Sequence, residues 1–131
     1  MPEHAFRLDR HREHPRLKLP AMYTLLRVRQ PGETRYRWFG HIYDVSLSGM
    51  RFELDTPLEA GTQVEVRGML PGRAHIQFRA TGKVVRIHDN TAGPTRMALT
   101  FDSFHRKADR RRLQDYLTIE SQPTHVQRKA A

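Results

Sequence analysis

Two groups of polar residues in this chain have the types and spacing to bind one anionic ligand that carries a base. Asp44, Ser46 and Gly49 fall within six residues at the expected end of a strand, and Arg12 and Arg16 lie in a basic segment near the N-terminus. A carboxylate supplies hydrogen-bond acceptors, a hydroxyl supplies a donor, and a glycine allows close backbone approach, while guanidinium groups bind phosphate bidentately. This combination indicates a nucleotide sensor rather than an enzyme.

The sequence carries no recognisable signature of catalysis or metal binding. We find no serine–histidine–aspartate set and no paired carboxylates, and the segment 68–72 lacks the lysine of a phosphate loop. His11 and His14 have no further converging ligands, so no metal site is expected. The absence of cysteine excludes a disulfide framework and a thiolate site. We therefore expect a protein without enzymatic activity, metal or cofactor.

The overall charge of the chain indicates an anionic partner. The 131 residues carry a formal net charge of +9, and most of the 23 basic residues are arginine. Arginine binds phosphate or the O6/N7 edge of guanine bidentately and stacks on bases, so such a surface attracts nucleic acid, anionic lipid or a phosphorylated small molecule. Charge alone does not choose among these partners.

A run of aromatic residues offers a second way to bind nucleic acid. Single-stranded bases stack on aromatic side chains that alternate with basic ones on a barrel face. The same spacing arises when a strand alternates between core and surface positions, and both interpretations stay open at the level of sequence. The residues concerned are aromatic Tyr36, Trp38, Phe39 and Tyr43 and basic Arg35, Arg37 and His41.

Apolar periodicity predicts six short strands followed by one helix. The fifth strand changes phase near Gly82, which indicates a β-bulge. Between residues 106 and 119, the spacing of Leu113, Tyr116 and Leu117 becomes helical. The sequence therefore predicts an all-β fold with a terminal helix, in which a six-stranded antiparallel β-barrel is capped by a C-terminal α-helix. The expected strands cover residues 17–28, 36–45, 50–54, 64–70, 75–88 and 97–101.

The expected helix carries a basic surface. We interpret its cations as a solvated face, partly balanced by nearby aspartates, although such a face can also dock an acidic partner. The cations are Arg106, Lys107, Arg110, Arg111 and Arg112, and the aspartates are Asp102, Asp109 and Asp115.

The chain is expected to form one domain with polar ends. Residues 1–16 are charged and aperiodic, which predicts a flexible basic arm that carries Arg12 and Arg16. Residues 17–120 would form the barrel and helix, and 121–131 a disordered tail. No segment has the apolar run of a signal peptide or a membrane span, so we expect a cytoplasmic protein without membrane insertion.

The motifs and their order resemble the PilZ domain, the bacterial cyclic di-GMP receptor module. That family has an R-x-x-x-R motif before the first barrel strand and a D/N-x-S-x-x-G motif in a later turn. Here residues 12–16 match the first motif and residues 44–49 match the second. The segments 81–86 and 97–102, followed by a basic helix, resemble the last strands and helix of the family, so the resemblance covers about residues 10–120.

The resemblance implies a cyclic di-GMP site, and the chemistry of these residues suits that ligand. Arg12 and Arg16 would supply guanidinium forks for its two phosphates or for guanine. Asp44 would accept hydrogen bonds from the guanine donor edge, or it would satisfy backbone amides of its own turn. Ser46 would donate to a phosphate, or it would only close the turn. For Gly49 we expect a conformational role rather than direct contact: it would either adopt a positive φ or leave space for a ligand atom.

The number of bound ligands stays open at this level. In the family, an additional arginine just before the R-x-x-x-R motif is associated with a stacked ligand pair. This chain has His11 at that position and Arg10 one residue earlier, and His11 either contacts the ligand or is solvated.

The resemblance implies a receptor that binds cyclic di-GMP and signals to a separate, unidentified protein. Because the arm is rich in charge, we expect it to be mobile without ligand and to clamp onto the barrel when the dianionic ligand binds. Two alternatives remain at this stage. One is a small basic barrel that binds single-stranded RNA or DNA, which we consider the weaker interpretation. The other is a protein adaptor that has kept the motifs.

Overall fold

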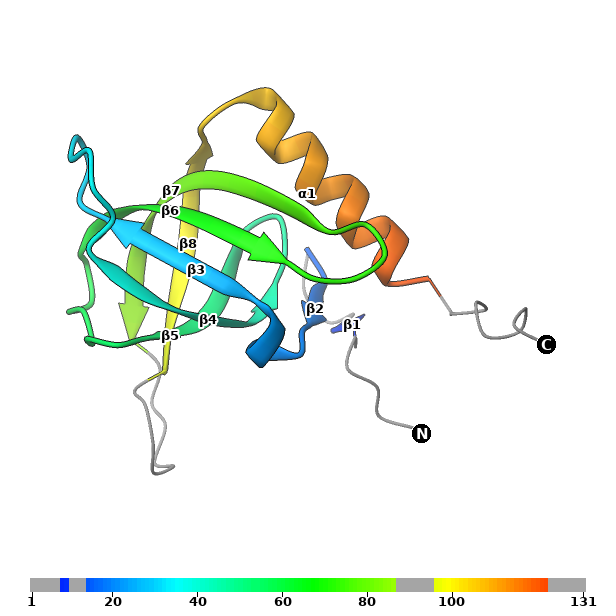
Figure 1. Cartoon of the computed structure of the whole chain (residues 1–131), viewed down its shortest axis with the longest axis horizontal. Helices are drawn as coiled ribbons and strands as arrows, with labels where there is room; N and C mark the ends of the chain where they lie inside the picture. Colours follow the sequence, from blue (N-terminus) through cyan, green and yellow to red (C-terminus); the bar gives the residue numbers. More distant parts are fainter. Residues whose placement is uncertain (1–7, 10–13, 87–95, 123–131) are drawn as a thin grey trace.

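Six antiparallel strands close into a barrel, and one helix, α1 (Lys107–Glu120), lies beside its end (Figure 1). The computed structural model describes residues 8–9, 14–86 and 96–122. The barrel strands are β3 (Leu25–Arg29), β4 (Trp38–Val45), β5 (Gly49–Leu54), β6 (Gln63–Leu70), β7 (Ile76–Arg86) and β8 (Arg96–Phe104). They pair in the order β3, β6, β7, β8, β5, β4, and β4 returns to β3. The predicted fold class is confirmed.

Alternate residues of each strand fill the barrel interior, as the pleat of a strand requires. In β6, Val64, Val66 and Leu70 are fully buried. Gly68 occupies the remaining inward position, where a Cβ would lie 2.6 Å from the ring of Phe78. The glycine therefore makes room for the large aromatic core residue on the neighbouring strand.

The expected strand over residues 17–28 is wrong as one continuous element. It is divided into β2 (Arg16–Lys18), the 3-10 helix η1 (Ala21–Tyr23) and β3. Pro20 lacks the N–H that a continuing ladder needs, and the chain turns there. β2 and β3 nevertheless pair with the same strand, β2 with the end of β4 and β3 with its start.

The side chain of Thr24 bridges the gap between these two pairings. Its Oγ1 accepts a hydrogen bond from the backbone N–H of Ile42 at 2.7 Å and donates to the carbonyl of Ala21 at 2.8 Å. The amide of Leu19 donates to the carbonyl of Tyr43 at 2.9 Å. On the edge that faces β2 and β3, the middle of β4 therefore keeps its backbone partners although no regular strand lies beside that edge.

The register of β7 and β8 shifts at Gly82, but the phase change predicted for the fifth strand is wrong. Val84 is buried and Val85 is exposed, so β7 keeps its alternation and the extra residue lies in β8. Thr81 lies opposite Ser103, whereas Gly82 lies opposite Phe101, so Asp102 is the extra residue. A Cβ on Gly82 would lie 2.4 Å from the carbonyl oxygen of Thr100, which explains the glycine. The extra residue shifts the alternation of β8, and Phe101 and Phe104 come to lie on the same side of the strand.

The helix α1 packs on the barrel through the face that its spacing predicted. Leu113 and Tyr116 are fully buried, and the Tyr116 hydroxyl donates a hydrogen bond to the carbonyl of Pro71. Near the helix end, the Glu120 carboxylate accepts a hydrogen bond from the amide of Ala74 at 2.9 Å. These contacts hold the connection between β6 and β7 against the helix. The described residues include no helix with the length and apolarity needed to cross a membrane.

Asp109 is not one of the solvated charges that the sequence suggested. It is 2% exposed, and its carboxylate accepts hydrogen bonds from the amide of Arg79 in β7 at 2.9 Å and from the amide of Arg106 at 3.1 Å. A guanidinium nitrogen of Arg112 lies 3.2 Å away. A helical pattern cannot reveal this role, because the main partner is a backbone group of a distant strand.

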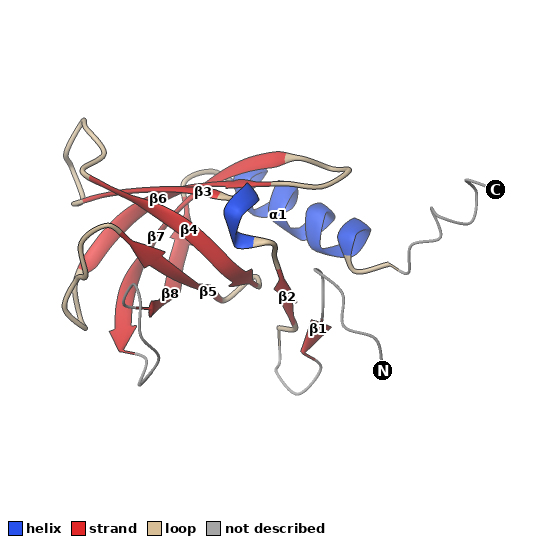
Figure 2. Ribbon diagram, turned by 60° about the horizontal axis from the view of Figure 1, so that its bottom comes forward, coloured by secondary structure: helices blue, strands red, loops and turns tan. Residues whose placement is uncertain are grey.

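Part of the predicted arm is joined to the sheet. β1 (Leu8–Asp9) pairs with β2, and Arg16 is the first residue of β2 rather than part of a segment before the barrel. Figure 2 shows these two strands beside the end of β4, outside the barrel. Residues 1–7, 10–13 and 123–131 lie outside the described residues, so the flexibility of the arm and of the tail stays a prediction.

The buried carboxylate of Asp109 should be a main anchor of the helix. We expect Asp109→Ala to lower the free energy of unfolding by about 2–3 kcal/mol, because two backbone amides lose their buried acceptor. Urea denaturation measures this loss, with Asp115→Ala as the control, since Asp115 is exposed on the same helix and its loss should cost about 0.5 kcal/mol or less. Equal losses in the two variants would contradict this role for Asp109.

Candidate ligand-binding site

The carboxylate of Asp44 lies near the end of β4, where three basic residues converge on it. In the register of the sheet, Asp44 is opposite Lys18 of β2 on one side and opposite Arg51 of β5 on the other. Arg16 lies two residues before Lys18 in the same short strand. The position of Asp44 between two antiparallel partners therefore determines which cations surround it.

The carboxylate is paired with two guanidinium groups at loose distances. Nε of Arg16 lies 3.7 Å from Oδ1 of Asp44, and Nε of Arg51 lies 3.9 Å from Oδ2. Both separations exceed hydrogen-bond length. The Asp44 side chain is 6% exposed, that of Arg16 is 18% exposed and that of Arg51 is 44% exposed. The acid therefore lies at the base of the cluster, and Arg51 lies at its solvent side.

Burial and charge act in opposite directions on Asp44. Burial raises the pKa of Asp44 above its usual value of 3.8, while the charges of Arg16, Arg51 and Lys18 and the backbone amide of Arg51 oppose that rise. Its Oδ1 atom is buried and receives no hydrogen bond from any described residue. A buried acceptor without a donor is costly, and it is a common feature of binding sites that a ligand completes.

The turn after Asp44 uses both of the other motif residues for its own structure. The hydroxyl of Ser46, which is 1% exposed, accepts a hydrogen bond from the amide of Ser48 at 3.1 Å and lies 3.1 Å from the Ser48 hydroxyl. The amide of Ser46 donates to the carbonyl of Gly49 at 2.8 Å. In this structure Ser46 closes the turn, which is the second of the two roles expected for it.

The reasons expected for Gly49 need correction. Among the described glycines, positive φ angles occur at Gly32, Gly61 and Gly72, so Gly49 is not required for a left-handed conformation. A Cβ on Gly49 would lie 2.1 Å from the carbonyl oxygen of Leu99 in β8. The space beside this glycine is therefore occupied by the neighbouring strand rather than left for a ligand.

The structure brings together Arg16 and Asp44, one residue from each of the two sequence motifs. Arg12, His11 and Arg10 lie outside the described residues, so their predicted contacts with the ligand are untested.

Arg51 and Lys18 belong to the cluster but were not among the predicted site residues. Arg51 could have been found from the sequence, because a hairpin with its turn at residues 46–49 places residue 51 opposite residue 44. Lys18 could not, because its pairing with Asp44 depends on the separate strand β2.

Three of the four aromatic rings in this run already have a cation over one face. Guanidinium groups of the chain itself lie over three of these rings, with centroid distances of 4.7 Å for Arg29 on Tyr36, 5.2 Å for Arg37 on Trp38 and 4.4 Å for Arg96 on Tyr43. Such cation–π contacts occupy the faces on which bases would stack. Phe39, at 45% exposed, is the most open of the aromatic residues in this run.

No cluster of potential metal ligands occurs within the part of the chain that the structure describes.

Solved structures with a similar fold include two bacterial proteins. The PilZ domain of YcgR from Escherichia coli, solved with c-di-GMP, aligns over 85% of this chain and 91% of that chain, with a TM-score of 0.53 and 19% identity. The inhibitor of motility MotI/DgrA of Bacillus subtilis aligns over 86% of this chain with a TM-score of 0.63 and 17% identity. This chain spans about half of MotI, 51% of its length. At such identities these likenesses establish the fold alone.

Sequence comparison gives the family. No curated protein matches this chain. The family model described as the PilZ domain matches residues 10–118, which is well over half of the chain and includes both motifs. The chain therefore belongs to the PilZ domain family.

Proposed function

We propose that this protein is a cyclic di-GMP receptor whose ligand binds at the cluster around Asp44. One observation carries the proposal: the motif acid is buried beside Arg16 of the other motif and beside Arg51, and one of its oxygens receives no hydrogen bond from the described residues. The similar PilZ domain of YcgR was solved with c-di-GMP, which supports the same ligand class here. Recognition requires no catalytic step, and we propose no enzymatic activity.

The ligand and the cluster have complementary chemistry. Guanine presents N1–H and N2 amino donors that a carboxylate accepts, so Asp44 would bind the donor edge of one base. Guanidinium groups of Arg16 and Arg51 would bind the phosphodiester oxygens or the O6/N7 edge of guanine. Arg12 would add a further guanidinium from the same motif as Arg16. The hydroxyl of Ser46 closes the turn after Asp44. It would affect binding only indirectly, by holding Asp44 in place.

Ligand entry requires the cluster to open. Asp44 lies beneath Arg16 and Arg51, so guanine reaches its carboxylate only if the ion pairs lengthen or are replaced. We propose that this exchange draws the basic segment before β2, which carries Arg12, onto the barrel and changes its conformation. The altered surface would then signal to a separate protein.

Binding of single-stranded nucleic acid is the weaker candidate. It requires exposed aromatic faces, and Arg29, Arg37 and Arg96 cover those of three aromatic residues. We therefore do not propose it.

The first test is a calorimetric titration with cyclic di-GMP. We expect Arg16→Ala and Asp44→Asn each to weaken binding by about tenfold or more, because each removes one charge-assisted interaction. Arg35→Ala and Asp115→Asn are matched controls, since both residues are exposed and lie outside the cluster. GTP should not compete at equal concentration. Absence of binding by the unmodified protein, or equal weakening in the controls, would contradict the proposal.

The pH dependence of binding should follow the ionisation of Asp44. The carboxylate must be charged to accept both guanine donors, so affinity should fall as pH decreases through the raised pKa of Asp44. The affinity of Asp44→Asn, which is already weak, should not show this fall with decreasing pH. Titrations of both proteins from neutral to mildly acidic pH would show it, and parallel pH profiles would exclude Asp44 as the acceptor.

In the ligand-free protein, the contribution of Asp44 to stability should fall as pH rises, whereas its contribution to ligand affinity increases. Between 3.8 and the raised pKa, folded Asp44 retains a proton that the unfolded chain has lost. The stability of wild type relative to Asp44→Asn should therefore fall as pH rises across this window and stay constant above it. Urea denaturation of both proteins at several pH values measures the difference, and a rise with pH would contradict the raised pKa.

The proposed movement of the arm is accessible to amide hydrogen exchange. Saturating cyclic di-GMP should slow exchange in residues 8–18, because the ligand would bind the arm to the barrel. Exchange in β6 serves as an internal control, because β6 pairs with β3 and β7 and not with the strands of the Asp44 cluster. Unchanged exchange in residues 8–18 despite saturation would exclude the movement while leaving ligand binding intact.

A further inference from the structure

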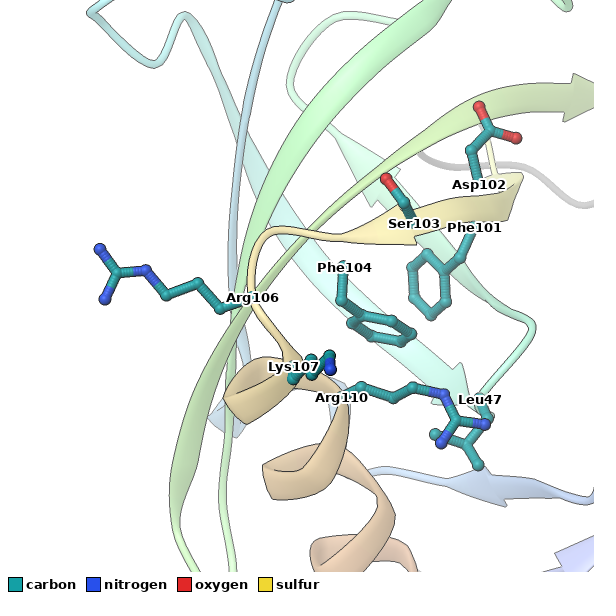
Figure 3. Close-up of a pocket in the computed structure, with 8 residues that line it drawn as sticks. All are labelled: Leu47, Phe101, Asp102, Ser103, Phe104, Arg106, Lys107 and Arg110. Atoms are coloured by element: carbon teal, nitrogen blue, oxygen red, sulfur yellow. The ribbon is translucent and has the colours of Figure 1, made fainter.

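A hollow beside the start of α1 combines an apolar floor with a basic rim (Figure 3). Its volume is about 390 Å³, enough for one or two large side chains of a partner. It is formed by the turn between β4 and β5, the end of β8 and the first helical turn. The residues that line it are Leu47, Phe101, Asp102, Ser103, Phe104, Arg106, Lys107 and Arg110.

The floor of the hollow is a supported aromatic surface. The bulge in β8 places Phe101 and Phe104 on one side, with their ring centroids 5.4 Å apart. Both rings contact the buried ring of Phe78, at 5.9 and 6.5 Å. Leu47 completes the floor from the opposite side (Figure 3). All three floor residues are only partly buried, so they offer apolar area to a partner.

The rim carries positive charge that the described residues do not neutralise. Arg110 extends along the floor toward Leu47, and Lys107 lies beside it, whereas Arg106 points away (Figure 3). The ion pairs of the described residues include none for Lys107 or Arg110. The nearest helical acid, Asp109, is buried and binds backbone amides and Arg112. The rim is therefore able to bind carboxylates of another molecule.

The polar atoms at the upper edge are directed away from the floor. The carboxylate of Asp102 accepts a hydrogen bond from Gln63 at 2.5 Å, and the hydroxyl of Ser103 lies 2.9 Å from that of Thr81. Figure 3 shows both groups pointing away from the two phenylalanine rings. Sequence-specific recognition of a nucleobase needs polar groups that face the base edge, and this floor offers none.

We propose that this hollow, here called the Phe101–Phe104 pocket, docks an acidic segment of a partner protein through one large apolar side chain. The apolar anchor would lie on the two phenylalanine rings, and flanking carboxylates would bind Lys107 and Arg110. Such an arrangement, with an aromatic anchor inside and charge at the rim, is typical of protein interfaces. The partner is thus defined by its chemistry: acidic residues around an exposed aromatic or long aliphatic residue.

The pocket shares a turn with the proposed ligand site. Leu47 follows Ser46 directly, and the carbonyl of Ser48 accepts a hydrogen bond from the amide of Phe101 at 2.9 Å. A shift of Asp44 and its turn on ligand binding would therefore move one wall of the pocket. This coupling rests on the proposed cyclic di-GMP function, whereas the docking itself does not.

A defined peptide tests the docking. The probe is a short fluorescent peptide with one tryptophan flanked by glutamates, and the reference has alanine in place of the tryptophan. We expect the tryptophan peptide to bind the full chain more tightly than the alanine peptide. Arg110→Glu should weaken its binding by about tenfold or more. Arg111→Glu is the matched control, because it changes the net charge equally at an exposed position outside the pocket.

The possible outcomes separate the pocket from nonspecific attraction. Equal weakening by Arg110→Glu and Arg111→Glu, or equal binding of both peptides, would overturn the proposal. A second measurement is the change in backbone amide shifts on adding the tryptophan peptide, which should be centred on Leu47, Phe104 and Lys107. Changes centred elsewhere would also overturn it. A single-stranded oligonucleotide that displaces the peptide and binds more tightly would reassign the pocket to nucleic acid.

The same experiment distinguishes this proposal from the receptor function. Arg110→Glu should bind cyclic di-GMP as wild type does, because it lies outside the Asp44 cluster. Saturating cyclic di-GMP should change the affinity for the peptide. An unchanged affinity would overturn the coupling. A chain that binds peptide but not cyclic di-GMP would overturn the receptor function and the coupling but not the docking.

Discussion

The site depends on keeping one carboxylate buried near the end of a strand. Desolvation of Asp44 opposes its charge, and Arg16, Arg51 and Lys18 are what make that charge tolerable. The cations come from two different strands, so the cluster exists only when β2 and β5 both pair with β4. A ligand that brings hydrogen-bond donors and phosphates satisfies the same carboxylate and the same guanidinium groups. The affinity for such a ligand would therefore depend on the pairing of β2 and β5 with β4.

The turn between β4 and β5 links this cluster to the rest of the molecule. Ser46 is used to close the turn, and Gly49 allows β8 to approach within a distance that any side chain would prevent. The motif therefore serves to join β5 to β8, in addition to presenting the proposed ligand contact at Asp44. Because Leu47 projects from the same turn into the Phe101–Phe104 pocket, a change at Asp44 has a short structural route to an exposed surface.

The sequence was most informative where apolar spacing decides the structure. Apolar runs and alternation predicted the approximate positions of the barrel strands, and helical spacing identified Leu113 and Tyr116 as buried. The phase change expected in the fifth strand was wrong, because the extra residue lies in β8. It was least informative where a polar side chain replaces a backbone partner. Thr24 continues the pairing past Pro20, and Asp109 binds the backbone of β7, yet both look like surface residues in a linear pattern. Of the site, the pairing of Arg16 with Asp44 agreed with the motifs, whereas Lys18 depended on a strand pairing that local sequence does not specify.

The central claim is that the Asp44 carboxylate is the acceptor that cyclic di-GMP completes. Carboxyl carbon NMR of Asp44, measured across pH with and without saturating cyclic di-GMP, tests it most directly. We predict a raised pKa in the free protein and a pronounced fall of that pKa in the complex, because the bound guanine donors stabilise the charged form. A carboxyl signal whose pKa is the same in the free and saturated protein would contradict the account.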